Sequence, residues 1–176
     1  MQEKTVKSST VFRGKIVEVK VDTVTLPDGR QTEREVVEHP GAVAVVAMTE
    51  NEEVLLVSQF RYPVGEILLE VPAGKLEPGE DPLESAKREL AEETGFMANS
   101  WELLSVFYTT PGFSNEIMYL YLARDLSPDK KQADDDEFIE VHRISLTDAM
   151  SKALSGDFKD AKTIAGILIS GFKSGK

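Results

Sequence analysis

The acidic residues Glu89, Glu92 and Glu93 lie close together in the segment Arg88-Glu89-Leu90-Ala91-Glu92-Glu93-Thr94-Gly95. On a helix that advances 100° per residue they fall at about 240°, 180° and 280° from the middle of an apolar stripe, so the three carboxylates share one arc. Like charges at these spacings destabilise a helix by about 0.2–0.5 kcal/mol per pair. Oxygen ligands of this kind suit Mg²⁺ or Mn²⁺. The pattern therefore predicts a divalent-cation site on one face of a helix.

The residues around this segment mark the ends of the helix and a loop before it. Asp81 can cap the first turn, Pro82 suits the first helical position, and Gly95 can end the helix. The preceding segment 72–80, PAGKLEPGE, contains two glycines and Pro78, so backbone atoms can approach a ligand there. A glutamate-rich helix alone is more often a solvated face. Its combination with this loop is far more specific.

The spacing of these residues matches every fixed position of the Nudix box, namely Gly74, Glu80, Arg88-Glu89-Leu90, Glu92-Glu93 and Gly95-Phe96. The chain therefore resembles Nudix hydrolases. The resemblance implies an α/β/α sandwich that cleaves a nucleoside diphosphate linked to another group, with Mg²⁺ or Mn²⁺ as the cofactor. It also implies that Glu89 and Glu93 bind the metal, with Glu92 as a third side-chain ligand and the carbonyl oxygen of Ala73 as a backbone ligand. Arg88 would orient the glutamates, and Glu80 would have a structural role.

Residues outside the box resemble the ADP-ribose pyrophosphatase branch of this family. Pro111 follows Gly95 at the spacing at which that branch carries a proline, and 110–116 resembles its substrate loop. The segment 59–63 resembles its phosphate-contacting segment, although Phe60 stands where tyrosine is common, and the likeness continues to 160–163. The predicted substrate-binding residues are Arg61, Arg34, Glu35, Thr110, Pro111, Gly112 and Glu116.

The residues alone leave the general base and the role of Glu116 open. Glu116 could hold ribose hydroxyls, or it could be only an exposed residue at the start of a strand. A base is needed because carboxylates committed to metal are poor proton acceptors. The resemblance places Glu137, in an acidic loop, at the mobile-loop glutamate of the family, a residue that could bind the metal or take a proton from water. Asp135 is its rival, and a helix glutamate such as Glu92 is the remaining choice.

The composition indicates one ordinary globular domain of 176 residues, with 41% hydrophobic and 29% charged residues. A net charge of −11 argues against general nucleic-acid binding, and it means that an anionic pyrophosphate needs local positive charge from a metal and from Arg61. The absence of cysteine excludes disulfides and thiolate metal sites. The longest apolar runs are too short to cross a membrane, and the first residues lack the apolar core of a signal peptide. We therefore expect a cytoplasmic protein with no membrane partner.

The helices and strands that position these residues are predicted from hydrophobic periodicity and from turn and capping residues. The run 42–48, AVAVVAM, predicts a strand buried on both faces, and other strands are expected at 15–21, 33–38, 53–60, 67–71, 103–108, 117–123 and 138–144. Helices are expected at 82–94, 146–154 and 160–172. The predicted fold class is α/β (α+β), a mixed sheet with helices outside it and a small N-terminal antiparallel sheet. By resemblance, residues 1–41 would form a homodimerisation extension and residues 42–176 the Nudix hydrolase domain.

Three functions compete for this sequence. The first is Mg²⁺-dependent hydrolysis of ADP-ribose, or of a related nucleoside diphosphate sugar, to AMP and ribose 5-phosphate. The second is a Nudix pyrophosphatase for another nucleotide, such as a nucleoside triphosphate or a dinucleoside polyphosphate, which the region around Pro111 disfavours. The third is a non-catalytic ADP-ribose sensor. Because such sensors tend to lose glutamates of the box, the retention of Glu89, Glu92 and Glu93 favours an enzyme.

Overall fold

Two compact units make up the chain in the computed structural model, which describes residues 1–129 and 139–176. The first unit contains Met1–Gly41 and Phe107–Met118, and the second contains Ala42–Val106 and Tyr119–Lys176. The first unit thus includes a segment from the middle of the chain in addition to the N-terminal extension.

The first unit is built on an antiparallel sheet with the order β1-β2-β3, formed by Lys4–Arg13, Glu18–Thr25 and Gln31–Glu38. Gly29, at φ 88°, closes the predicted turn between β2 and β3 by donating its N–H to the Leu26 carbonyl at 2.9 Å. Strand β1 was not predicted. Its pairing with β2 is interrupted after Thr5 and after Thr10, and such irregularities break the alternation that identifies a strand.

The segment 109–116 joins this sheet at the end of β3. The N–H of Val37 donates to the Phe113 carbonyl at 2.7 Å, and the Val37 carbonyl accepts from Asn115 N–H at 3.2 Å. The side chain of Asn115 also accepts the His39 N–H at 2.9 Å. These bonds place the predicted substrate loop beside the N-terminal extension within the first unit.

The main sheet has seven strands in the order β10-β5-β4-β9-β8, with β6 paired to β5 and β7 paired to β4. The strands are β4 (Ala42–Met48), β5 (Glu53–Arg61), β6 (Glu66–Glu70), β7 (Ala73–Lys75), β8 (Phe96–Tyr108), β9 (Ile117–Pro128) and β10 (Glu140–Ser145). All seven residues of β4 are buried, which confirms the prediction of a strand covered on both faces. Strand β7 was missed because three residues are too few to show a period.

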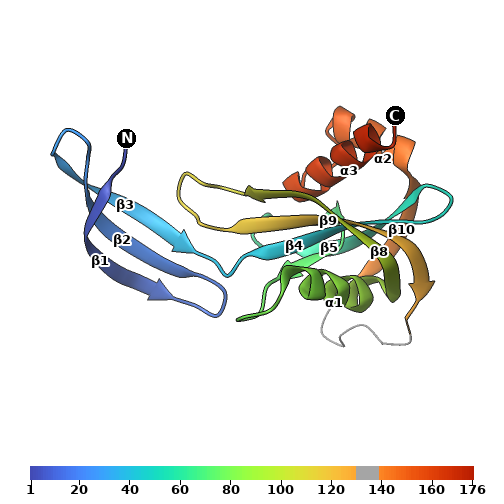
Figure 1. Ribbon diagram of the computed structural model, residues 1–176, viewed down its shortest axis with the longest axis horizontal. Helices are drawn as coiled ribbons and strands as arrows, with labels where there is room; N and C mark the ends of the chain where they lie inside the picture. The colour runs from blue at the N-terminus through green and yellow to red at the C-terminus, as the bar shows by residue number, and fades with distance from the viewer. Residues whose placement is uncertain (130–138) are drawn as a thin grey trace. The chain divides into compact units, whose positions relative to one another are not determined.

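The helices are α1 (Pro82–Thr94), α2 (Leu146–Ser155) and α3 (Ala161–Lys173). In the second unit, α1 covers one face of the sheet and α2 and α3 cover the other (Figure 1). Strand β4 contributes to both layers. Val43 and Val45 share a core cluster with Leu90 of α1, whereas a Cβ added to Gly166 of α3 would lie 2.8 Å from a methyl carbon of Val46. The predicted sandwich and its three helices are confirmed.

No helix among residues 1–129 and 139–176 is both long enough and apolar enough to cross a membrane.

Candidate active site

Helix α1 is held at both ends as its sequence predicts. The carboxylate of Asp81 accepts the N–H groups of Leu83 at 2.9 Å and Glu84 at 3.3 Å. At the other end, Gly95 adopts φ 71° and donates its N–H to the Ala91 carbonyl at 2.9 Å. Glycine adopts this left-handed conformation at the lowest conformational energy, because it has no Cβ atom. The caps fix where the helix begins and ends, and hence which side chains face β7.

Two glutamates of α1 lie against the backbone of β7. Glu93, which is 6% exposed, accepts the Ala73 N–H on its Oε2 atom at 2.9 Å. Glu89 lies so close to Gly74 that a Cβ built there would stand 2.0 Å from the Glu89 carboxyl carbon. The glycine is therefore required by close approach, because any side chain would displace Glu89. The predicted ligands Ala73, Glu89 and Glu93 are thus neighbours in the fold.

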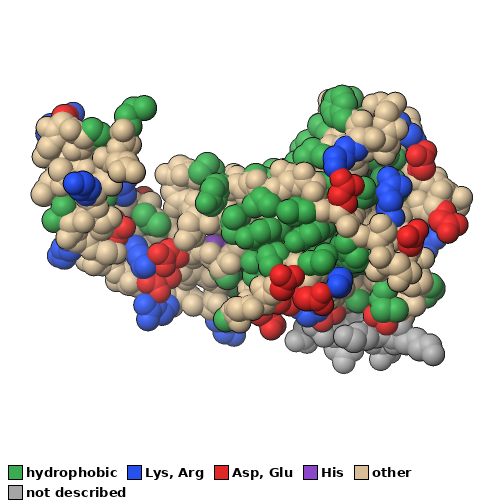
Figure 2. Space-filling model, viewed as in Figure 1, with side chains coloured by type: hydrophobic (Ala, Val, Ile, Leu, Met, Phe, Trp, Pro, Cys, Tyr) green, Lys and Arg blue, Asp and Glu red, His purple; other side chains and the backbone are tan. Residues whose placement is uncertain are grey.

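Arg88 ties three carboxylates together on the exposed side of α1. Its Nη1 atom donates to Glu89 at 2.7 Å and to Glu92 at 3.0 Å, and its Nε and Nη2 atoms donate to Glu80 at 3.0 and 3.1 Å. These hydrogen bonds lower the pKa of Glu80 to about 2 and raise the pKa of Arg88. Figure 2 shows acidic and basic side chains next to one another over α1. Arg88 thus contacts two of the glutamates that it is predicted to orient.

The donor set that the sequence predicts for this face suits a hard divalent cation. Its members are carboxylate oxygens and a backbone carbonyl, which are the ligands that Mg²⁺ and Mn²⁺ prefer. Within residues 1–129 and 139–176, no three acidic or histidine side chains converge as a metal site would require. Arg88 instead holds Glu89 and Glu92, and Ala73 holds Glu93. A bound cation would therefore have to replace some of these hydrogen bonds.

Arg61, the predicted phosphate ligand, ends β5 and forms a fork with Glu70 of β6. Its Nε and Nη2 atoms donate to the two Glu70 oxygens at 2.8 and 2.7 Å. The pKa of Arg61 is raised, first by this hydrogen bonding and then by nearby charges that include Glu93. Sequence reasoning missed Glu70. The available signal was a single acidic residue in the otherwise apolar run Ile67–Val71.

The remaining predicted substrate residues lie in the first unit. Arg34, Glu35 and Gly112 line one cavity of about 370 Å³ together with Val21, Glu33 and Phe113. The Nε and Nη2 atoms of Arg34 also donate to the two carboxylate oxygens of Glu3, at 3.0 and 2.7 Å. The fold thus brings residues 34–35 and 112, which are far apart in the sequence, to one place.

Thr110 and Pro111 form the turn at the tip of the same segment. The Thr110 carbonyl accepts the N–H groups of Phe113 at 3.2 Å and Ser114 at 3.0 Å. Glu116 accepts the Thr109 hydroxyl at 2.5 Å, and its other oxygen lies 3.6 Å from Nδ1 of His39. Glu116 therefore has two polar partners within its own unit.

Comparison with protein families shows which family the chain belongs to. The model described as "NUDIX domain" matches residues 38–166, and the one described as "Nucleoside diphosphate sugar hydrolase N-terminal domain" matches residues 3–37. The chain belongs to the Nudix family. The segments that hold Ala73, Glu89 and Glu93 fall within the matched Nudix domain, and β1–β3 fall largely within the N-terminal one.

Several known Nudix relatives span nearly the whole chain. An "ADP-ribose pyrophosphatase" of Bacillus subtilis is 44% identical, over 95% of this chain and 91% of its own length. A "Methanol dehydrogenase activator" of Bacillus methanolicus is 43% identical, over 94% and 91%. An "ADP-ribose pyrophosphatase" of Mycobacterium tuberculosis is 39% identical, over 93% and 81%. A solved structure titled "Crystal structure of ADP compounds hydrolase" matches with a TM-score of 0.85 at 24% identity, over 97% of this chain and 92% of that one. It supports the fold.

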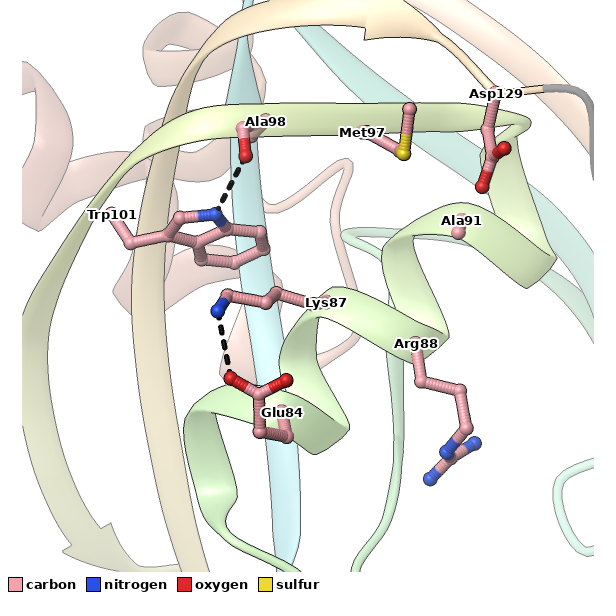
Figure 3. Close-up of a pocket in the computed structure, with 8 residues that line it drawn as sticks. All are labelled: Glu84, Lys87, Arg88, Ala91, Met97, Ala98, Trp101 and Asp129. Carbon is pink, nitrogen blue, oxygen red and sulfur yellow. Dashed lines mark hydrogen bonds and ion pairs between the residues drawn. The ribbon is translucent and has the colours of Figure 1, made fainter.

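A second cavity, of about 380 Å³, lies between α1 and the first residues of β8 (Figure 3). Its lining residues are Glu84, Lys87, Arg88, Ala91, Met97, Ala98, Trp101 and Asp129. Lys87 donates to Glu84 at 2.7 Å, and the Trp101 indole donates to the Ala98 carbonyl at 3.0 Å. None of the glutamates at 89, 92 and 93 lines it. Arg88 borders both this cavity and the predicted metal face.

Two predicted residues cannot be placed. Glu137, the first choice for the general base and a candidate metal ligand, and its rival Asp135 lie outside the described residues.

Proposed function

We propose that this Nudix protein hydrolyses the pyrophosphate bond of ADP-ribose, or of a related nucleoside diphosphate sugar, to AMP and ribose 5-phosphate with Mg²⁺. One observation carries the proposal: the carboxylates of Glu89 and Glu93 lie against the backbone of Ala73 and Gly74, with Arg61 within electrostatic reach of Glu93. Full-length relatives named "ADP-ribose pyrophosphatase" support the choice of substrate.

The residues that would hold the metal are Glu89, Glu93, Glu92 and the carbonyl of Ala73. When bound, Mg²⁺ neutralises phosphate charge and lowers the pKa of a bound water, and Mn²⁺ could substitute for it. Arg88 keeps Glu89 and Glu92 near each other despite their repulsion. The helix thereby presents an anionic face that attracts a dication, and binding would replace some of the hydrogen bonds that Arg88 and Ala73 make to these glutamates.

Other residues of the chain would bind the substrate and move the proton. Arg61 would hold a phosphate oxygen through N–H groups that Glu70 does not use. Arg34, Glu35, Thr110, Pro111, Gly112 and Glu116 are proposed to contact the rest of the nucleotide sugar. Glu137 is proposed as the general base that takes the proton of the attacking water, with Asp135 and Glu92 as the alternatives.

A substrate panel tests the function. ADP-ribose, another nucleoside diphosphate sugar, a nucleoside triphosphate and a dinucleoside polyphosphate are incubated with the protein, with and without Mg²⁺. We expect AMP and ribose 5-phosphate from ADP-ribose, only when the metal is present. A clear preference for the triphosphate would replace the proposed substrate, and ADP-ribose binding without AMP release would indicate a sensor.

We also propose that the protein is a cytoplasmic homodimer that pairs through the first unit. Among residues of β1–β3, only Val24 is buried. Val6, Val11 and Phe12 are each more than half exposed on β1, the edge strand of the small sheet. A second copy of the chain would cover these apolar side chains and the unpaired edge.

A further inference from the structure

The fork between Arg61 and Glu70 belongs to a larger group of charges. Glu70 is only 1% exposed, yet it also receives a hydrogen bond from the ammonium group of Lys162 on α3. Lys162 donates in addition to Asp160 at 2.9 Å. The group contains two carboxylates and two cations, so its formal charge is zero. A buried carboxylate needs charged or hydrogen-bonding partners, and the two cations provide them for Glu70.

The start of α3 fixes this group to the strand that leads to the metal face. Asp160 caps α3 by accepting the Thr163 N–H at 3.0 Å and its hydroxyl at 2.5 Å. The Thr163 hydroxyl oxygen in turn accepts the N–H of Val71 at 2.9 Å. Val71 adjoins Glu70, and two residues later the Ala73 N–H bonds to Glu93. Two hydrogen bonds, joined by the short backbone segment 71–73, thus connect α3 to the candidate metal ligand Glu93.

Arg61 is the member of the group that opens most to solvent. Its side chain is 38% exposed, against 13% for Lys162, 17% for Asp160 and 1% for Glu70. The fork uses two of the five guanidinium N–H groups, so other N–H groups are available for a phosphate oxygen. The planar fork also fixes the direction in which those groups point.

We infer that Glu70 is a positioning residue, which, together with Lys162 and the cap of α3, aims Arg61 at the phosphate of the substrate. The inference rests on the proposed function, because it assumes that Arg61 binds the pyrophosphate. Glu70 itself does not touch the substrate and acts through Arg61. A 1 Å error in the placement of such a group can cost about 100-fold in rate.

The Glu70→Gln variant separates a positioning role from a simple electrostatic effect, because the two predict opposite changes in KM for ADP-ribose. Removing a negative charge beside an anion site should by itself strengthen phosphate binding. If Glu70 positions Arg61, KM for ADP-ribose should rise and kcat/KM should fall about 10- to 100-fold despite the more positive charge. An unchanged or lower KM would overturn the inference.

A double-mutant cycle tests whether Glu70 acts through Arg61. Once Arg61→Ala has removed the guanidinium, adding Glu70→Gln should change kcat/KM less than about twofold, because interacting sites are not additive. A full additional loss would show that Glu70 acts independently of Arg61, against the inference. Calorimetric binding of the non-hydrolysable α,β-methylene analogue of ADP-ribose should follow the same pattern and does not depend on turnover.

Lys162→Met provides a second variant in case Glu70→Gln does not fold. We expect it to raise KM about 3- to 10-fold, within the usual range of coupling between neighbouring residues. Lys159→Met is the matched control, since Lys159 pairs with Glu66 on the surface, where both side chains are about half exposed, and should leave KM unchanged. Equal KM values for the two variants would contradict the inference. If wild-type protein cleaves no ADP-ribose with Mg²⁺, the proposed function fails first.

Discussion

At the scale of single residues, the candidate site depends on contacts between side chains and backbone. Glu93 is buried and bonded to the Ala73 amide, and Glu89 occupies the space that a side chain at position 74 would need. Arg88 offsets the repulsion between Glu89 and Glu92. Without a cation, three like charges on one arc would destabilise α1. The arginine thus keeps an anionic face in place.

Replacing Glu93 with Gln should abolish most of the activity. The side chain keeps its size and an oxygen that can accept the Ala73 N–H, so the fold should survive, but a neutral amide is a poor ligand for a hard cation. We expect kcat with ADP-ribose and Mg²⁺ to fall about 100-fold or more. Glu84→Gln, on the same helix but paired with Lys87 on the surface, is the control and should retain activity. Full activity of Glu93→Gln would contradict the metal role.

The pair Glu80–Arg88 should make stability depend on acid pH. Arg88 lowers the pKa of Glu80 from 4.5 to about 2, so its contribution is present above pH 4.5 and is lost as the pH falls towards 2. Urea unfolding of wild type and Glu80→Gln should therefore show a difference in unfolding free energy near pH 6 that shrinks by pH 2.5. A difference independent of pH would show that the charge of Glu80 contributes nothing to folding.

At the scale of elements, the residues that begin and end helices were more informative than hydrophobic periodicity. The bounds of α1 follow from Asp81, Pro82 and Gly95, and the structure places the helix at those residues. Glu84, in the first turn, pairs with Lys87. Strand β8 begins at Phe96, earlier than predicted, because the exposed apolar residue Met97 and the consecutive exposed residues Asn99 and Ser100 break the alternation.

The sequence identified the chemistry of the site better than its internal pairing. The box places Glu89, Glu92 and Glu93 on one helical face because three- and four-residue spacings have a fixed geometry. The side chain that pairs with Arg61 could not be predicted from sequence spacing. In the pairing of β5 with β6, Arg61 lies opposite Glu66 and Glu70 lies opposite Val57, so the contact between Arg61 and Glu70 does not follow from strand pairing. The contact of Lys162 depends on where α3 packs.

The cap of α1 offers a test at this scale. Asp81→Ala removes the acceptor for two helix N–H groups and should lower the unfolding free energy by about 1 kcal/mol. Asp81→Asn retains an acceptor oxygen and should cost much less. Urea denaturation of both variants measures the difference. Equal losses would mean that the charge of Asp81, and not its hydrogen bonds, stabilises the helix.

At the scale of the whole molecule, the two units differ in how much they bury. The second unit contains a core on both faces of β4, whereas β1–β3 bury only Val24. A three-stranded sheet with so small a core is marginal by itself. The proposed homodimer would supply the missing apolar contacts.

A charge placed on β1 should weaken the dimer. Val11 is 62% exposed, and Val11→Glu would put a carboxylate into an apolar contact, which costs free energy unless the charge is paired. Light scattering after size exclusion should report a dimer for wild type and for the control Lys4→Gln, and a shift towards monomer for Val11→Glu on dilution. A wild-type monomer would refute the proposed assembly.

The hydrogen bond from the Ala73 amide to Glu93 gives the site a built-in spectroscopic reporter. A cation that draws the Glu93 carboxylate towards itself must lengthen or polarise this bond, so the ¹⁵N–¹H resonance of Ala73 should move as Mg²⁺ is added. The amide of Val71 should move much less, because it bonds to the hydroxyl of Thr163 on α3. One titration on labelled protein would therefore follow metal occupancy without any substrate present.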